Sequence, residues 1–287
     1  PRRHAKTSLV SHALPIHLLI QPREHNIYFP GRLGANTRIL MAQETERRAM
    51  DNMRVLHVAF ESNLTLRRVW PHVCWDKPIR DARKWNERAI IVPREVEFPD
   101  PSVSVIGVGG AITGARFDVM VKDDLITEEA ANSETVMQNA IQWHVNSRAL
   151  FDDQEKSLEY IIGTRWAVAD LYQYVIDNDP TVEVMKRAIV EDGQPIYPEA
   201  FTKKTVLSLQ QQFGVMFSFL FMNDPSNPDV VDFVEDDIRQ FRLHDNLLYF
   251  NEDARDEQLR KLYGPGTIKT DSEGLAPELT GYMRFRS

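Results

Sequence analysis

Short apolar runs alternate with amphipathic segments from Arg38 to Gly214, and this alternation constrains the fold more than any other feature of the chain. The apolar runs predict strands at Arg38–Gln43, Arg88–Pro93, Ser102–Val108, Phe117–Val121, Leu158–Thr164 and Val182–Val190. Helical spacing and capping residues predict helices at Thr45–Phe60, Glu134–Leu150, Asp170–Ile176 and Thr202–Gly214. Strands that alternate with helices are typical of an α/β domain with a largely parallel sheet.

Chain length, charge and cysteine content limit what such a domain can be. The 287 residues suffice for one large domain, or for one domain and the beginning of a second. The net charge of −8 excludes a globally basic DNA-binding protein, so a nucleic acid would need a localised basic patch. Cys74 is the single cysteine, which excludes an intrachain disulfide and favours a reducing cytoplasm. No apolar run reaches the length of a membrane span.

The first residues, PRRHAKTSL, carry part of a phosphate-binding motif. Lys6 and Thr7 match the end of G-x-x-x-x-G-K-[ST], but Ala5 replaces the last glycine, and the first glycine would precede Pro1. Taken alone, these residues are better explained as a basic N-terminal tail. The choice between a phosphate loop and a tail therefore depends on the rest of the chain.

Two adjacent carboxylates follow the predicted strand at Phe117–Val121. Asp123 and Asp124 would lie at the carboxyl edge of a parallel sheet, where such folds bind their ligands. In a nucleotide hydrolase the first would hold Mg²⁺, and the second would orient or deprotonate the attacking water. Considered alone, the pair is better explained as a solvated turn after a strand.

Two loops near these strands also contain glycine. The stretch GVGGAITG, from Gly107 to Gly114, does not predict a dinucleotide-binding fingerprint, because a strand and not a helix is expected after it. We interpret it as a tight connection between two strands. Thr164 and Arg165, at the end of another strand, could sense or contact a phosphate, although a loop with Trp166 packed on the core explains them equally well. The histidines show no metal-ligand spacing, and no G-x-S-x-G elbow is present.

The order of the motifs is more specific than any single one of them. A Lys-Thr loop is followed by RILMAQETERRAMDNM, GVGGAITGARFDVMVKDDLIT, IIGTRWAVADLY and PIYPEAFTKKTVLSLQQQFG. This succession resembles the ATPase domain of large terminase subunits, the DNA-packaging motors of tailed bacteriophages, from Pro1 to about Pro228. The GTRW stretch and the DDL that ends a strand are its most specific parts. The resemblance favours a phosphate loop over a basic tail at the start of the chain.

The resemblance implies a P-loop NTPase fold of the ASCE (RecA-like) type, with a mostly parallel sheet flanked by helices. It also implies that ATP and Mg²⁺ bind to the chain. The residues implied to form the nucleotide-binding loop are Arg2, Arg3, His4, Ala5, Lys6, Thr7 and Ser8. Within this loop Lys6 would contact the β- and γ-phosphates, Thr7 would ligate Mg²⁺, and Arg2 would stabilise charge on the γ-phosphate.

The other implied site residues lie at the ends of two predicted strands. Asp123 would hold Mg²⁺ together with the loop, and Asp124 would act on the attacking water. Thr164 would report the state of the phosphate to the part of the motor that grips DNA. Arg116 would reach the nucleotide of a neighbouring subunit. The resemblance thus implies an ATP-hydrolysing motor that works as a homo-oligomeric ring.

The implied partners are double-stranded DNA, a portal protein and a small terminase subunit, in the cytoplasm of a bacterial host and without a membrane. Residues 1–228 would be the ATPase domain, truncated at its N-terminus and lacking its first strand. Residues 229–287 would be a linker or the start of a C-terminal region, too short for the nuclease domain of these proteins. Ala5 is a departure from the family pattern, because its Cβ crowds a backbone that must approach phosphate closely.

Two alternatives to a packaging motor remain at this point. One is another P-loop NTPase that acts on nucleic acid, such as a helicase. The other is a truncated or degenerate fragment that keeps the fold but has no ATPase activity. The replacement of glycine by Ala5 supports the second alternative.

Overall fold

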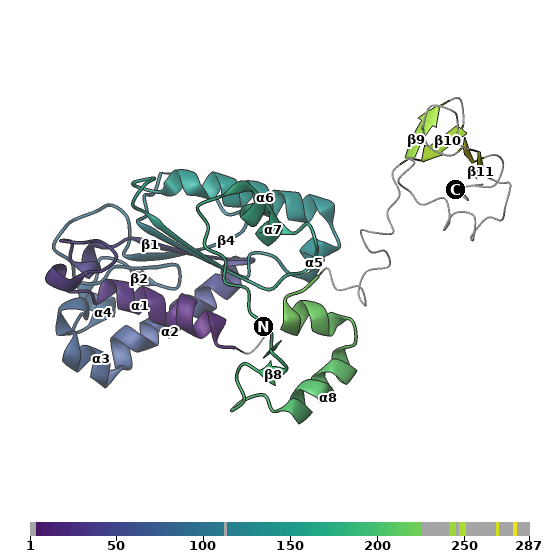
Figure 1. Ribbon diagram of the computed structural model, residues 1–287. Coiled ribbons are helices and arrows are strands. Elements are labelled where there is room, and N and C mark those ends of the chain that lie inside the picture. Colours follow the sequence, from purple (N-terminus) through teal and green to yellow (C-terminus); the bar gives the residue numbers. More distant parts are fainter. Residues whose placement is uncertain are drawn as a thin grey trace. The chain divides into compact units, whose positions relative to one another are not determined.

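The computed structural model describes residues 4–111 and 114–225 and four strands between residues 241 and 279. The chain divides into two compact units, residues 1–227 and 228–287, and each is described by itself. The first unit is an α/β structure in which helices cover both faces of a six-stranded sheet (Figure 1). None of the described helices is both long enough and apolar enough to cross a membrane.

The sheet of the first unit has the strand order β2-β3-β4-β1-β5-β6. The strands are β1 (Ile39–Gln43), β2 (Trp85–Asn86), β3 (Ala89–Ile90), β4 (Val103–Gly107), β5 (Val119–Asp123) and β6 (Leu158–Ile162). Strands β4, β1, β5 and β6 are parallel, whereas β2 and β3 extend the sheet in antiparallel fashion. The predicted α/β class with a largely parallel sheet is therefore confirmed.

The carboxyl ends of the four parallel strands are level with one another. Gln43 of β1 is in register with Gly107 of β4 and with Asp123 of β5. Asp123 is in turn in register with Ile162 of β6, and the next amide, Asp124 N–H, donates to the Ile162 carbonyl at 2.9 Å. These strand ends form the edge at which open α/β sheets bind ligands.

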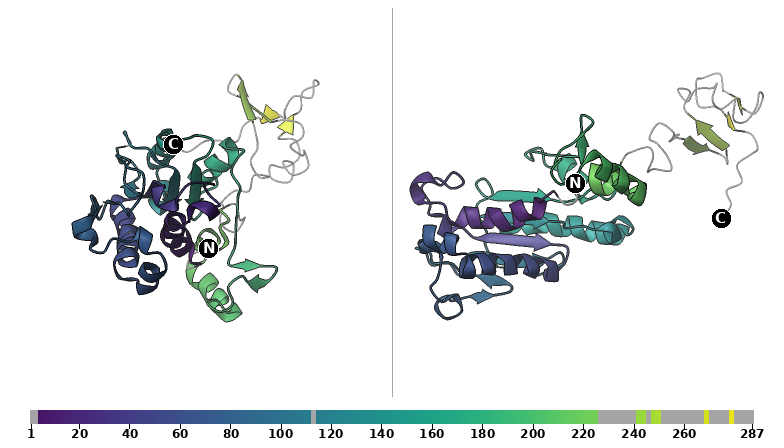
Figure 2. Two further views of the ribbon diagram at one scale, coloured as in Figure 1. Left: turned by 90° about the vertical axis from the view of Figure 1, so that its left-hand side faces the viewer. Right: turned by 90° about the horizontal axis from the view of Figure 1, so that it is seen from below.

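Helices connect the strands and cover the sheet. The first unit contains η1 (a π-helix, Ser8–Ala13), α1 (Leu14–Leu19), η2 (Arg23–His25), η3 (Gly34–Asn36), α2 (Glu46–Ser62), α3 (Leu64–Val69), η4 (Pro71–Val73), α4 (Pro78–Asp81), α5 (Glu128–Ala131), α6 (Glu134–Ser147), η5 (Arg148–Leu150), α7 (Leu171–Asn178), α8 (Lys203–Phe213) and η6 (a π-helix, Ser218–Met222). Helices α1 and α2 lie on one face of the sheet, and α6 and α7 lie on the other (Figures 1 and 2).

Strand β5 lies between β1 and β6, and all five of its residues are buried. Successive side chains of a strand point to opposite faces of the sheet. Asp123 accordingly meets Ser11 of η1 on one face, whereas Lys122 meets His144 of α6 on the other. Burial on both faces explains why the strand is a nearly continuous apolar run.

Local capping chemistry fixes where the predicted helices begin. The side chains of Ser133, Asp170 and Thr202 accept hydrogen bonds from backbone amides in the first turns of α6, α7 and α8. At the other end of α8, Gly214 adopts a φ of 51°, which only glycine adopts without strain. The four predicted helices are all present, with ends shifted by a few residues at most.

The prediction of a strand at Val182–Val190 is wrong. Residues 182–188 have no regular structure, and the short strand β7 (Val190–Glu191) pairs with β8 (Gln194–Pro195). Residues 183–187 are exposed to solvent, so their apolar members have no surface to pack against. The tendency of valine and isoleucine to form strands depends on such packing.

Two further sequence interpretations need correction or addition. The glycine-containing stretch does not join neighbouring strands tightly, because β1 lies between β4 and β5. No helix follows the glycines within the described residues before β5, which agrees with the rejection of a dinucleotide fingerprint. The helix that runs through Ser8–Ala13 and Leu14–Leu19 was not predicted.

The second unit contains short strands, in residues that the sequence predicted to be a linker or the start of a C-terminal region. Strands β9 (Phe241–His244) and β10 (Leu247–Phe250) form an antiparallel hairpin, joined by β12 (Glu278–Leu279) and β11 (Ile268–Lys269) in the order β11-β12-β10-β9. The rest of residues 229–287 lies outside the described residues.

Candidate active site

The chain turns sharply at Ala5 and enters a helix. Ala5 has a φ of 57°, in the left-handed region that favours glycine, and its carbonyl accepts the first helical hydrogen bond from Leu9 N–H at 2.9 Å. Helical backbone then continues from Lys6 to Leu19. The position that the phosphate-loop motif reserves for glycine thus has the backbone conformation that glycine adopts most readily.

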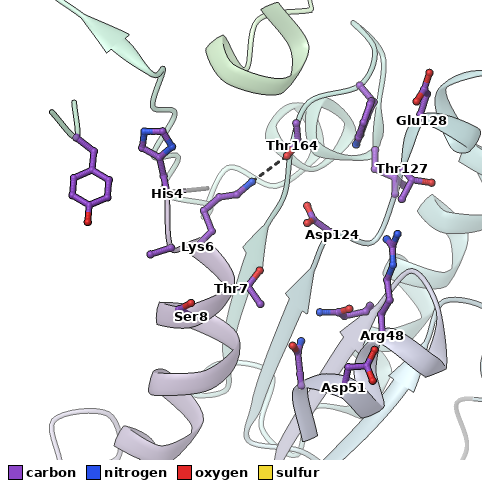
Figure 3. Close-up of a pocket in the computed structure, with 16 residues that line it drawn as sticks. His4, Lys6, Thr7, Ser8, Arg48, Asp51, Asp124, Thr127, Glu128 and Thr164 are labelled. Atoms are coloured by element: carbon purple, nitrogen blue, oxygen red, sulfur yellow. Dashed lines mark hydrogen bonds between the residues drawn. The ribbon is translucent and has the colours of Figure 1, made fainter. Parts of the chain in front are cut away.

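Lys6 links the start of this helix to the end of β6. Its ammonium group donates to the carbonyl of Gly163 at 2.8 Å and to the hydroxyl of Thr164 at 3.1 Å (Figure 3). Thr164 is buried and follows β6 directly. Two residues that the sequence predicted to act at one phosphate therefore lie in direct contact.

Asp123 ends β5 with its carboxylate buried beneath the helix start. One oxygen, Oδ2, accepts from the Ser11 hydroxyl at 2.7 Å and from the Gln43 amide at 3.2 Å. The other oxygen, Oδ1, is buried and has no hydrogen-bond partner among the described residues. A buried carboxylate oxygen without a partner is costly unless a ligand satisfies it, so Oδ1 is suited to a cation or its water shell.

Asp124 lies one residue further on, where the chain leaves the sheet. Its φ of 46° is left-handed, a conformation that aspartate tolerates better than most residues. Its N–H donates to Ile162 O, and its carbonyl accepts from Glu44 N–H at 3.3 Å. These backbone bonds on both sides hold Asp124 at the mouth of the sheet edge, with its side chain in the cleft (Figure 3).

A cleft of about 1090 Å³ opens at this edge of the sheet. Small-molecule sites commonly measure ~300–1,000 Å³, so this cleft is large enough for a nucleotide. Its lining comes from the helix start, β1, α2, the loop after β5, the loop after β6 and the β8–α8 segment. The lining residues are His4, Ala5, Lys6, Thr7, Ser8, Gln43, Arg48, Asp51, Asn52, Asp124, Ile126, Thr127, Glu128, Thr164, Trp166 and Tyr197.

Gly163 is required by the packing of the loop after β6. A Cβ at this position would lie 1.9 Å from the hydroxyl oxygen of Tyr172, which is far too close. Burial raises the pKa of the Tyr172 hydroxyl well above its ordinary value, and the negative charges of Asp124 and Asp170 raise it further. The phenol is therefore a neutral group behind the cleft wall that carries Thr164.

Arg165 does not reach the cleft. Its Nε donates to Asp170 Oδ2 at 2.9 Å, and one of its terminal nitrogens donates to the carbonyls of Ala167 and Val168. Asp170 is fully buried and also caps α7. Arg165 therefore stabilises the loop, which agrees with the structural alternative considered for it and not with a phosphate contact.

The structure does not place Arg116 in the cleft. Arg116 is exposed and precedes Phe117 and β5, so it lies at the amino edge of the sheet, opposite the carboxyl edge. Its predicted role toward a neighbouring subunit stays a prediction. Arg2 and Arg3 lie outside the described residues.

His4, the first described residue of the loop, packs against aromatic side chains. Its ring stacks on Phe201 with 4.8 Å between ring centroids and meets the edge of Tyr197 at 6.3 Å. This contact joins the start of the chain to the segment that leads into α8. His4 and Ser8, both predicted to belong to the loop, line the cleft with Ala5, Lys6 and Thr7.

Sequence reasoning missed Ser11, Gln43 and Arg48. Ser11 comes four residues after Thr7 in a helix, a spacing that places both on one side, but the helix itself was not predicted. Gln43 ends a strand in register with Asp123, which no local pattern reveals. Arg48 occupies the first turn of α2, where cations are unfavourable, and this was a usable signal.

Comparison of the sequence with models of known protein families gives no match, and comparison with curated proteins gives none. What the cleft does is therefore inferred from its residues.

Proposed function

We propose that residues 1–227 form a Mg²⁺-dependent ATPase of the P-loop class, and that this ATPase is the motor domain of a phage large terminase. The observation that carries the proposal is the convergence of Lys6, Asp123, Asp124 and Thr164 on one edge of a parallel sheet. A lysine, two carboxylates and a helix start at one edge of a sheet are the groups that phosphoryl transfer requires.

The residues of the loop would hold the phosphates of ATP. The first amides of the helix after Ala5 have no helical acceptors, and together with the helix dipole they favour an anion. Lys6 would exchange its contacts with Gly163 and Thr164 for the β- and γ-phosphates. Asp124 would orient the attacking water and accept its proton as the water oxygen bonds to the γ-phosphorus and the bond to the β-phosphate oxygen breaks.

Thr7 and Asp123 are the residues that would hold Mg²⁺. Within the described residues, no three His, Cys, Asp or Glu side chains cluster in a way that could hold a metal ion by themselves. Magnesium at nucleotide sites takes only one or two protein ligands and completes its shell with phosphates and water. The unpartnered Oδ1 of Asp123 fits such a site. When bound, Mg²⁺ neutralises charge on the phosphates.

Thr164 would couple the chemistry to movement of double-stranded DNA into a procapsid. Its hydroxyl accepts a hydrogen bond from Lys6, so movement of Lys6 toward a phosphate would change the contacts of the loop after β6. Work of this kind would use a ring of subunits on a portal protein, with a small terminase subunit, in the bacterial host cytoplasm. These partners enter through the resemblance of the motifs to terminases.

One observation favours a second candidate, a fold that no longer hydrolyses ATP. Ala5 carries a Cβ in a left-handed conformation at the point where the loop must come close to phosphate. Such a Cβ weakens phosphate binding if it displaces the backbone amides. The proposal therefore predicts that the loop tolerates Ala5, and the second candidate predicts that it does not.

Translocation along duplex DNA separates the motor from its alternatives. The assay follows ATP-dependent displacement of a third strand from a triplex, and in parallel the unwinding of a duplex with a single-stranded tail. A packaging motor displaces the third strand and leaves the duplex intact, whereas a helicase unwinds the duplex. Asp124→Asn serves as the control for hydrolysis. Absence of ATP turnover from the folded chain, with or without DNA, would refute the motor and support the inactive fold.

A further inference from the structure

Among the arginines that the structure describes, Arg48 is the one that lines the cleft. It projects from the first turn of α2, across the cleft from Lys6, with Asp124 between them in the view of Figure 3. Its side chain is 55% exposed, so the guanidinium is accessible to a ligand in the cleft. Arg48 thus places an arginine on the cleft of this chain itself, whereas Arg116 was predicted to act on the nucleotide of a neighbouring subunit.

The placement of Arg48 opposes the local preferences of a helix. Thr45 caps α2 by accepting from Arg48 N–H at 3.4 Å, so Arg48 stands at the position where a capping box has Glu or Gln. The positive end of the helix dipole also disfavours a cation there. Neither the cap of α2 nor the helix dipole therefore explains an arginine at this position.

A carboxylate holds the Arg48 side chain at the cleft wall. Glu44 Oε2 accepts from Arg48 Nη1 at 2.7 Å, and Glu44 Oε1 accepts from the Thr127 hydroxyl at 2.5 Å. Thr127 also lines the cleft, in the loop that follows Asp124. Glu44 therefore ties Arg48 to the loop of the catalytic carboxylates and restricts the positions that the guanidinium can take.

We propose that Arg48 is a catalytic residue that contacts the γ-phosphate from the wall opposite Lys6. This inference rests on the proposed ATPase function. A planar guanidinium binds phosphate oxygens in a bidentate manner and is always charged, which suits the charge that develops during transfer. Lys6 would then serve the β- and γ-phosphates from one side, Arg48 would serve the γ-phosphate from the other, and Asp124 would face the attacking water between them.

The test compares Arg48→Ala and Arg48→Lys with Arg47→Ala. Arg47 is the matched control, because it is an exposed arginine in the same helical turn that does not line the cleft. For each protein the turnover number and KM for Mg²⁺-ATP are measured without DNA, together with the ATP dissociation constant, the affinity for duplex DNA and the melting temperature.

We expect Arg48→Ala to lower the turnover number by roughly 10²–10³-fold, with ATP affinity changed far less, because the contact strengthens in the transition state. Arg48→Lys should recover little, since an ammonium cannot bind in a bidentate manner. The melting temperature of Arg48→Ala should equal or exceed that of the unaltered chain, because a cation leaves a helix N-terminus. Arg47→Ala should keep its turnover.

Three results would overturn the inference. If the unaltered chain hydrolyses ATP and Arg48→Ala does so equally fast, the proposed function stands and the role of Arg48 is refuted. If Arg48→Ala binds duplex DNA more weakly but turns over ATP normally, Arg48 is a DNA contact. If the unaltered chain is folded but neither binds nor hydrolyses ATP, the proposed function and the inference fail together.

Discussion

Lys6 Nζ lies 3.1 Å from the hydroxyl of Thr164, although the two residues are 158 positions apart in the chain. Lys6 also donates to the carbonyl of Gly163 at 2.8 Å. The residue proposed to bind phosphate and the residue proposed to report its presence are thus hydrogen-bonded to each other. A bound phosphate would therefore compete with the loop after β6 for the ammonium group of Lys6.

Removal of the Thr164 hydroxyl should tighten ATP binding. Thr164→Val keeps a similar side-chain shape but deletes an acceptor that Lys6 must leave, and hydrogen bonds to charged groups contribute ~1.5–3 kcal/mol. Because the Gly163 carbonyl remains, we expect a decrease in the ATP dissociation constant of about 3- to 10-fold. Titration calorimetry measures this, with the exposed Thr65→Val as the control. Weaker or equal binding by Thr164→Val would show that the contact does not compete with nucleotide.

Restoration of glycine at position 5 should improve both stability and phosphate binding. A left-handed conformation costs an L-residue ~1–2 kcal/mol, and glycine removes this cost. Part of the gain is lost because glycine also makes the unfolded chain more flexible. Ala5→Gly should therefore raise the free energy of unfolding by about 1 kcal/mol and lower the ATP dissociation constant.

The control for this change is Ala13→Gly. Ala13 lies in helical backbone further along the same segment, where glycine costs roughly 0.5–1 kcal/mol relative to alanine. The two Ala→Gly changes should thus have opposite signs in a denaturant titration. A loss of stability in Ala5→Gly would contradict the left-handed conformation at this position.

A methyl group at position 163 should destabilise the loop after β6. In Gly163→Ala the new Cβ would meet the Tyr172 hydroxyl, and forced overpacking typically costs ~1–3 kcal/mol. If the clash is the cause, most of this cost disappears when Gly163→Ala is made in a Tyr172→Leu background. The double-mutant cycle is measured by urea unfolding. Equal costs in the two backgrounds would assign the effect to something other than Tyr172.

Acid should lower the free energy of unfolding of the first unit, because His144 is buried in its neutral form. Burial lowers the pKa of this imidazole to about 3, and the positive charges of Lys122 and Arg148 act in the same direction, whereas Asp179 opposes them. Lys122 donates to His144 Nδ1 at 3.0 Å and pairs with Glu159, whose carboxylate also lies 3.9 Å from the imidazole. The ring is neutral in the folded state but protonated in the unfolded state between about pH 3 and its ordinary pKa of 6.5.

The sign of the pH dependence follows from this difference. The unfolded state binds the additional proton, so the contribution of His144 is fully present above pH 6.5 and is lost as the pH falls toward 3. We expect the free energy of unfolding to fall by about 2 kcal/mol between pH 7.5 and 5. His144→Gln should remove most of this fall, whereas the exposed His72→Gln should keep it. An unchanged pH profile in His144→Gln would refute the assignment.

Local patterns explain which parts of the fold were predictable. Signals that act over only a few residues each predicted a correct strand or helix. They are the apolar run that ends at Asp123 and the capping side chains of Ser133, Asp170 and Thr202. The prediction of a strand at Val182–Val190 failed because Val184 and Met185 are exposed, and exposure depends on which surfaces meet in the folded chain.

A site residue could be predicted from the sequence where it lies at the end of a predicted strand. It could not be predicted where its place in the site depends on contact between elements that are distant in the chain. Asp123 follows from its strand, but its bond to Ser11 depends on where the first helix lies on the sheet. Arg116 precedes a parallel strand, so its position at the amino edge of the sheet could have been predicted from the sequence. Arg48 reaches the cleft only because the register of β1 brings the start of α2 beside the end of β5.

Hydrolysis of Mg²⁺-ATP in a single turnover, by the unaltered chain, Lys6→Ala and Asp124→Asn, tests the central claim most directly. The account predicts that the unaltered chain binds and hydrolyses ATP, that Lys6→Ala loses affinity for ATP, and that Asp124→Asn binds ATP but hydrolyses it roughly 10²-fold more slowly or worse. Equal hydrolysis by all three proteins would place the reaction elsewhere. Absence of ATP binding by the folded, unaltered chain would contradict the account altogether.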